Sequence, residues 1–139
     1  MAAVGMTRCA DRSDSCAEQK IPDASFSAST TFADQYSAFD GRLNDEWYWA
    51  ALAPGTGEDH WLQVDLGQTK TIVAMDIQGS QAGLGWEEWV QLFTVAYSTD
   101  GSTYTDYAEG GRVVEFEGNT QGEIDRGFRG LTRTPWASS

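Results

Sequence analysis

The chain has few basic residues. Nine Lys and Arg stand against 21 Asp and Glu, so the formal net charge is −12 and the isoelectric point is about 4.2. Nucleic-acid binding draws much of its affinity from Lys and Arg placed against phosphates. This charge balance, together with the lack of any helix-turn-helix, zinc-finger or RNA-binding signature, predicts that no nucleic acid is a partner.

Long hydrophobic runs are lacking as well. No apolar stretch approaches the roughly 18 residues that a membrane helix requires. The first seven residues carry no long apolar run, so they do not have the pattern of a signal peptide. We expect that any export signal lies outside this chain.

Catalytic signatures are missing too. The single histidine, His60, carries no nucleophile elbow or other local motif with it. No glycine-rich phosphate loop with a Lys-Ser/Thr partner is present. Paired carboxylates occur at Asp45-Glu46 and Glu87-Glu88, but a glycosidase needs two such groups facing one site, and solvated acidic neighbours are far commoner. We predict a protein that is not an enzyme.

What the sequence does contain is a series of strand patterns. In residues 61–67, WLQVDLG, apolar and polar residues alternate with a period of two and end at a glycine, which is typical of a half-buried strand. Similar runs occupy residues 71–77 and 92–98, and a shorter one residues 25–29. The third run leads into Asp100-Gly101, a strong hairpin-turn dipeptide. Hydrophobic residues make up 40% of the chain and aromatic residues 12%, so we expect one domain with a hydrophobic core.

The order of these motifs resembles the discoidin domain, also called the coagulation factor V/VIII type C domain, in the galactose-binding-like superfamily. The matching pieces, in order, are IPD at 21–23, SAS at 27–29, RLN at 42–44, WLQVDLG at 61–67, QG at 78–79, W..WV at 86–90, YSTDG at 97–101 and FEGN at 116–119. The resemblance implies an all-β fold, an antiparallel jelly-roll β-sandwich. It also implies an extracellular protein, secreted or on the cell surface.

The resemblance divides the chain into a polar N-terminal tail, residues 1–20, and a discoidin-like domain, residues 21–139, with a divergent or truncated C-terminal segment. It fades after Asn119, and the family's closing strand is missing. The open sheet edge that this would leave predicts pairing with a divergent segment, a tail or a second chain, so self-association is one outcome.

The two cysteines, Cys9 and Cys16, both lie in the expected tail. The family usually pairs a cysteine before the first strand with one at the domain's end, and this chain has no C-terminal cysteine. We therefore predict a local Cys9–Cys16 disulfide, worth about 2.5 kcal/mol by loop entropy. Two free or intermolecular thiols remain the alternative, and a zinc site lacks a second ligand pair.

Residues 38–41 also resemble the start of galactose-binding-like carbohydrate modules, several of which hold a structural calcium. Calcium takes about six to eight oxygen ligands. Asp40 and Asn44 offer two of these ligands. A structural calcium at these residues is therefore one interpretation, and a simple Asp-Gly turn is the other. No cofactor is predicted to be required. Arg42 matches the family's Arg-Leu pair, where a structural guanidinium beneath the loops is the alternative to direct ligand contact.

Three loops, residues 31–39, 44–60 and 80–89, carry the candidate binding residues. In membrane-binding members of the family, apolar residues at loop tips insert into phospholipid. Phe32 and Tyr36 occupy the first such tip by rough alignment, and Leu84 and Trp86 the second. Among residues 47–49 we expect Trp49 to pack inward, as a family tryptophan does near here, leaving Trp47 and Tyr48 exposed.

The loops carry seven carboxylates and no Lys or Arg. Each basic residue near an anionic leaflet is worth about 1 kcal/mol, an attraction that these loops forgo. An uncharged carbohydrate, a cell-surface or microbial glycan, is therefore the predicted ligand, because aromatic faces stack on sugars and polar groups bond their hydroxyls. Phospholipid binding and protein–protein adhesion are the alternative functions. The simplest interpretation is that the loops only cover the core and bind nothing. The predicted binding residues are Phe32, Asp34, Gln35, Tyr36, Asn44, Asp45, Glu46, Trp47, Tyr48, Leu84 and Trp86.

Overall fold

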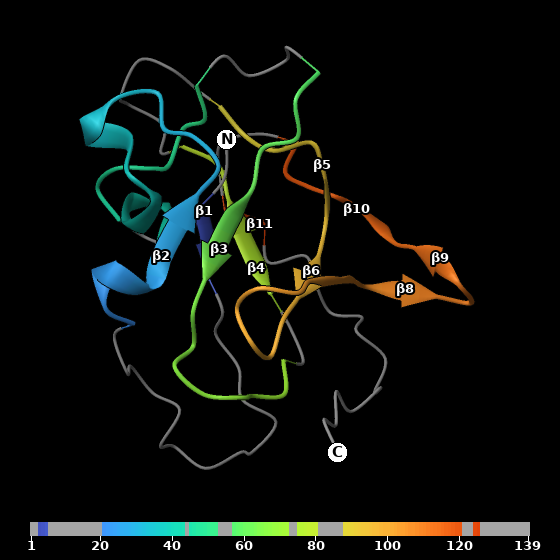
Figure 1. Cartoon of the computed structure of the whole chain (residues 1–139). Helices are drawn as coiled ribbons and strands as arrows, with labels where there is room; N and C mark the ends of the chain where they lie inside the picture. The colour runs from blue at the N-terminus through green and yellow to red at the C-terminus, as the bar shows by residue number, and fades with distance from the viewer. Residues whose placement is uncertain are drawn as a thin grey trace.

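The computed structural model confirms the all-β prediction. It describes residues 3–5, 21–43, 45–52, 57–72, 75–80, 88–120 and 124–125. The strands are short, and the helices within these ranges are single 3-10 turns (Figure 1). The strands are β1 Ala3–Gly5, β2 Phe26–Ala28, β3 Leu62–Val64, β4 Asp76–Gln78, β5 Leu92–Thr94, β6 Ala96–Tyr97, β7 Thr105–Asp106, β8 Ala108–Glu109, β9 Arg112–Val113, β10 Glu115–Glu117 and β11 Ile124–Asp125; the 3-10 turns are η2 Asp23–Ser25, η3 Asp34–Tyr36 and η4 Ala38–Gly41.

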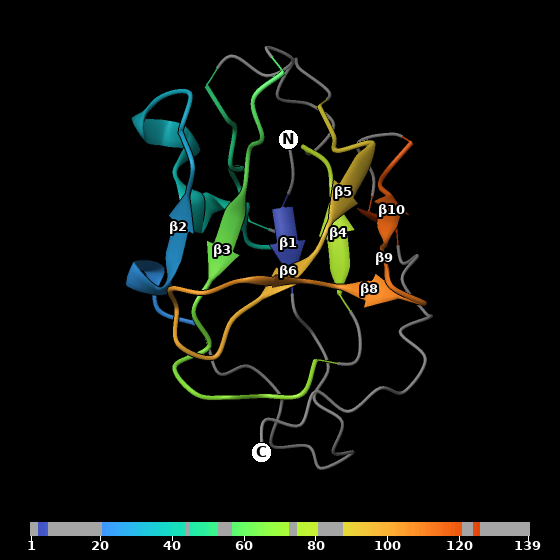
Figure 2. The same cartoon turned by 45° about the vertical axis from the view of Figure 1, so that its right-hand side comes forward.

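Every pair among the described strands is antiparallel. β4 lies between β1 and β11, and the other pairs are β2–β3, β5–β10, β6–β7 and β8–β9. Figures 1 and 2 show β2 and β3 side by side in both views, with the 3-10 turns next to β2 and the β8–β9 hairpin reaching away from the body.

The predicted strands form, but they are shorter than the patterns suggest. The 25–29 pattern contains β2, and the 61–67 pattern contains β3, whose Gln63 lies opposite Ser27 in the ladder. The 92–98 pattern divides into β5 and β6 at Val95. In the described residues of the 71–77 pattern, Ile72 forms an isolated β-bridge and β4 starts only at Asp76.

β1 comes from the segment expected to be a polar tail. Its three residues pair with β4 in the register Ala3↔Gln78, Val4↔Ile77 and Gly5↔Asp76. The sheet therefore extends into the chain before residue 21. The predicted boundary between tail and domain stays a prediction, and Cys9 and Cys16 lie outside the described residues.

The core has an aromatic stack on one side. The rings of Phe93 and Phe116, which face each other in the β5–β10 pair, stack with centroids 5.4 Å apart. The ring of Tyr107 stacks on Phe116 at 5.9 Å, and both Tyr107 and Phe116 are buried. Phe116 therefore links β5, β10 and the β7–β8 segment. Ile77 on β4 is buried as well.

The predicted hairpin turn at Asp100-Gly101 is confirmed between β6 and β7. Gly101 has φ of 72°, a left-handed conformation that suits glycine. The Asp100 carboxylate Oδ1 accepts hydrogen bonds from the backbone N–H groups of Ser102 and Thr103, each at 2.8 Å, and from the Ser98 hydroxyl at 2.9 Å. These bonds, led by that from Thr103, lower the pKa of Asp100 to about 2.

Acid is therefore expected to loosen this turn. A lowered folded-state pKa means that the ionised Asp100 stabilises the turn above its ordinary pKa of 3.8, and that this contribution is lost as pH falls toward about 2. A carboxyl-carbon NMR titration should place the Asp100 midpoint near 2. Asp100→Asn keeps an acceptor oxygen without titrating, so its turn amide shifts should stay constant between pH 4 and about 2, and equal drift in both proteins would contradict the assignment.

Candidate functional site

Three aromatic rings gather where the first two predicted loops meet. The ring of Tyr36 on η3 lies edge-on to Phe32, with centroids 5.7 Å apart, and edge-on to Trp47 at 6.1 Å. Phe32 is 57% exposed and Trp47 45% exposed. Edge-to-face packing is a favourable geometry for aromatic pairs. We call Phe32, Tyr36 and Trp47 the aromatic cluster.

Backbone bonds hold the two loops of the cluster together. The Phe32 N–H donates to the Ala50 carbonyl at 2.8 Å, and the Ala50 N–H donates to the Tyr36 carbonyl at 3.5 Å. Ala50 itself is buried. Because both loops share these bonds, the rings of Phe32 and Trp47 are presented from a fixed backbone.

A capping box sets the turn between η3 and η4. The Ser37 backbone N–H donates to Asp40 Oδ2 at 2.8 Å, while the Ser37 hydroxyl donates to the Asp34 carbonyl at 2.6 Å. The first bond satisfies a backbone donor at the start of η4, and the second satisfies a backbone carbonyl of η3. The carboxylate of Asp40, which the sequence predicts as a candidate calcium ligand, is here a structural acceptor.

Only one of the two predicted calcium ligands, Asp40, lies in the described residues. Partial burial raises the pKa of Asp40, and Asn44 lies outside the described residues. Within the described ranges, no three His, Cys, Asp or Glu side chains come together as a metal-binding group. A structural calcium at Asp40 and Asn44 therefore stays a prediction, since calcium needs about six to eight oxygen ligands.

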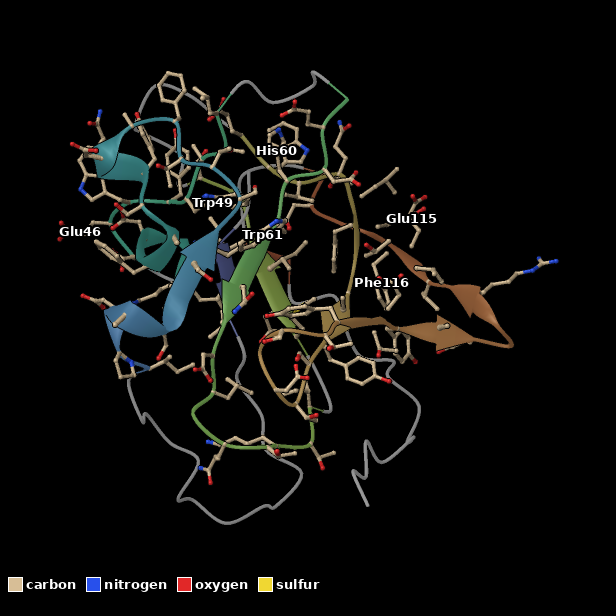
Figure 3. All side chains as sticks on the ribbon, in the orientation of Figure 1. Glu46, Trp49, His60, Trp61, Glu115 and Phe116 are labelled. Atoms are coloured by element: carbon tan, nitrogen blue, oxygen red, sulfur yellow. The ribbon has the colours of Figure 1, made fainter. Side chains whose placement is uncertain are left out.

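Trp49 packs inward, as predicted. It is 5% exposed, and its indole N–H donates to the Thr30 carbonyl at 2.9 Å. The Thr30 hydroxyl oxygen in turn accepts from the Leu52 N–H at 3.1 Å. Figure 3 shows Trp49 beside the upper end of β2, whereas Glu46 lies on the outer side of the loops. Thr30, which no sequence pattern indicated, thus bonds both Trp49 and Leu52 at the start of the first loop.

The expectation that Tyr48 is exposed is wrong. Tyr48 is 6% exposed, with its ring 5.2 Å from that of Tyr36 and its hydroxyl donating to Glu88 Oε2 at 3.3 Å. Burial, with a smaller effect of the Glu88 charge, raises the pKa of Tyr48 to about 12. Its ring supports the cluster from beneath and is not offered to a ligand.

Glu88 ties the start of the next strand region to the site. Its backbone N–H donates to the Ser80 hydroxyl at 2.8 Å, and its carbonyl accepts from the Ser80 N–H at 2.8 Å. Of the acidic pair Glu87-Glu88, Glu88 therefore has a structural role, because its carboxylate accepts the hydrogen bond of the Tyr48 hydroxyl. Leu84 and Trp86, the predicted second tip, lie outside the described residues.

Charge at the site is negative. Asp34, Gln35 and Glu46 are exposed, and Asp45 Oδ1 accepts from the Glu46 N–H at 2.7 Å. The nearest base in sequence, Arg42, pairs with Asp23 at 2.5 Å and places its guanidinium 4.2 Å from the centre of the Phe26 ring. The structural interpretation of Arg42 is confirmed. The described parts of the three loops contain no Lys or Arg.

His60, the single histidine of the chain, lies beside Thr30. Its Nδ1 lies 3.5 Å from the Thr30 hydroxyl oxygen, and its Nε2 is buried with no hydrogen-bond partner in the described chain. His60 therefore lies next to Thr30, the residue that also bonds Trp49 and Leu52. Within the same ranges, no helix is long and apolar enough to cross a membrane.

The fold is that of a known family of domains. The family model described as F5/8 type C domain matches residues 22–128, and the chain belongs to this family, the discoidin domains. Its fold is accordingly the β-sandwich of that family. Members are generally binding modules rather than enzymes.

Relatives include lactadherin from Rattus norvegicus, 34% identical over 108 residues, and coagulation factor V from Sus scrofa, 34% identical over 106 residues. These alignments cover 71% and 73% of this chain, but only 25% and 4% of the relatives. Coagulation factor V from Bos taurus is 37% identical over 81 residues, which are 57% of this chain and 3% of that protein. The chain thus spans a quarter or less of the proteins it matches.

Proposed function

We propose that this chain is a non-catalytic extracellular recognition module that binds carbohydrate, a cell-surface or microbial glycan, through the aromatic cluster. The observation that carries the proposal is the exposure of Phe32 and Trp47 around a fixed Tyr36, beside carboxylates and without a base in the described loops.

The chemistry of the cluster suits a sugar ring. The exposed face of Trp47 can stack on the apolar C–H face of a pyranose, and the edge contact with Tyr36 limits its rotation. Exposed Asp34, Gln35 and Glu46 can accept hydrogen bonds from sugar hydroxyls, and the Gln35 amide can also donate. A fixed platform lowers the ordering cost of binding.

Phospholipid binding is the second candidate, because two apolar side chains project from the loops. Phe32 is 57% exposed and Leu52 is 51% exposed. Insertion of each side chain into a bilayer would contribute about 2 kcal/mol. An anionic leaflet would repel the neighbouring carboxylates, and no Lys or Arg in the described loops offsets that repulsion. The charge favours the neutral glycan.

The aromatic cluster is tested by Trp47→Ala. We expect loss of the stacking surface to raise the Kd for the bound glycan at least about tenfold, equal to about 1.4 kcal/mol. Because Trp47 is exposed, the melting temperature should change little. The measurement is a glycan array on wild type followed by titration calorimetry on both proteins.

Leu92→Ala is the matched control, since Leu92 is 56% exposed on β5 and belongs to no part of the cluster. It should leave the Kd unchanged. A phosphatidylserine liposome pull-down, run beside the array with and without calcium, separates the candidates. Retention on liposomes with a blank array would overturn the glycan proposal in favour of the membrane, and a blank result in both would point to a protein partner.

A further inference from the structure

The outward face of the β2–β3 pair carries an unusual set of side chains. Ser27 and Gln63 are directly opposite in the ladder and so share one face. The alternate positions, Phe26, Ala28, Leu62 and Val64, lie on the opposite face of the pair and are half-buried. Ser27 is exposed and Gln63 half-buried, so this face meets solvent.

Two exposed aromatic rings flank Gln63. Trp61 lies two residues before it, on the same face of the strand at about 7 Å, and is 50% exposed. Two hydrogen bonds fix the Trp61 backbone to Ser29, which follows β2. The Ser29 N–H donates to the Trp61 carbonyl at 3.0 Å, and the Trp61 N–H donates to the Ser29 hydroxyl at 3.1 Å. Figure 3 shows Trp61 at the upper end of β3.

The second ring comes from a distant part of the chain. Tyr104 lies just before β7, is 45% exposed, and its hydroxyl donates to Gln63 Oε1 at 2.5 Å. This bond orients the Gln63 amide, so that its NH2 group is directed away from the Tyr104 hydroxyl. Among the described residues, neither that NH2 group, nor the Trp61 indole N–H, nor the Ser27 hydroxyl has a hydrogen-bond partner.

We propose that Ser27, Trp61, Gln63 and Tyr104, which we call the outer face, form a second carbohydrate subsite for a neutral saccharide. The two rings offer stacking surfaces, and the Gln63 amide and the Ser27 hydroxyl match sugar hydroxyls, which both donate and accept. None of the four side chains is charged, which suits an uncharged ligand.

The size of the outer face favours a sugar over a protein. A stable protein interface buries about 800 Å² on each partner, from about 20 to 30 residues, whereas this face rests on four side chains. The face is also built from β2, β3 and the β6–β7 connection, while the aromatic cluster comes from the η3 region and residues 45–52. A domain with two sugar subsites would gain avidity on a glycan-bearing surface without a further contact.

The experiment uses the whole chain labelled with 5-fluorotryptophan. Fluorine NMR follows the Trp61 resonance, assigned with Trp61→Phe, during titration with neutral oligosaccharides of glucose, mannose, galactose and N-acetylglucosamine. We expect a saturable shift of the Trp61 resonance with at least one of them. Gln63→Ala should weaken that titration about tenfold, and Tyr104→Phe, which keeps the ring but loses the bond to Gln63, should weaken it several-fold.

Leu92→Ala, on a different strand pair, should leave the titration unchanged, and thermal melts of all variants confirm that they are folded. The Trp47 resonance, assigned with Trp47→Phe, reports the aromatic cluster in the same spectra. A moving Trp61 with a still Trp47 would refute the proposed function and support the outer face; the reverse would refute the outer face alone. The inference is also overturned if Gln63→Ala binds as wild type does.

Discussion

Gly118→Ala is expected to lower the free energy of unfolding by at least about 3 kcal/mol, the upper end of the usual cost of overpacking. A Cβ added at Gly118 would overlap the Val90 carbonyl oxygen and lie 2.8 Å from the Val90 carbonyl carbon. The Gly118 N–H also donates to the Gln91 carbonyl at 2.6 Å, so the two backbone segments cannot separate without losing that bond. Both contacts are backbone, which cannot change rotamer to make room.

The loss should spread into the neighbouring strand pair. Gly118 directly follows β10, which holds Phe116 in the aromatic stack against β5. Gly101→Ala is the matched control. Its added Cβ meets nothing within 4 Å, and only the left-handed φ of 72° opposes it, at about 1 to 2 kcal/mol. Urea unfolding of both variants measures the difference, and equal midpoints would show that the Val90 contact does not restrict residue 118.

The strands could be predicted because their signals are local. The alternation in residues 61–67 and the Asp100-Gly101 dipeptide each specify a conformation from adjacent residues, and β3 and the β6–β7 turn follow. The ends of the strands depend on pairing partners instead. β4 starts at Asp76 because its partners, β1 and β11, pair only with residues 76–78. No pattern in residues 71–77 predicts these partners.

Which of the candidate aromatic residues are exposed was predictable only in part. Loop position and ring content were enough to single out Phe32 and Trp47, both exposed, and Trp49, which is buried. Tyr48 differs because its burial depends on Glu88, 40 residues further on, which accepts its hydroxyl hydrogen bond. Such a contact leaves no periodic trace in the sequence. Thr30 was missed for the same reason, since its partners, Trp49 and Leu52, lie 19 and 22 residues away.

Trp49→Ala is expected to have the other large effect, because the buried Trp49 bonds the segment before the first candidate loop to the second. Removal of a buried tryptophan ring costs about 3 to 5 kcal/mol, a large part of the about 5 to 15 kcal/mol that stabilises a domain. The Thr30 carbonyl would also lose the indole N–H that it accepts at 2.9 Å. The adjacent Ala50, which bonds the backbones of Phe32 and Tyr36, would lose its anchor.

Trp49→Phe separates the two contributions. Phenylalanine keeps most of the buried apolar surface but has no N–H, so the expected loss is about 1 to 2 kcal/mol, mainly from the unpaired Thr30 carbonyl. Urea unfolding should therefore rank wild type above Trp49→Phe and Trp49→Phe well above Trp49→Ala. If Trp49 also fixes the aromatic cluster, glycan affinity should follow the same order in the folded fraction. Equal stability of the two variants would show that the hydrogen bond, and not the buried ring, holds the loops to the sandwich.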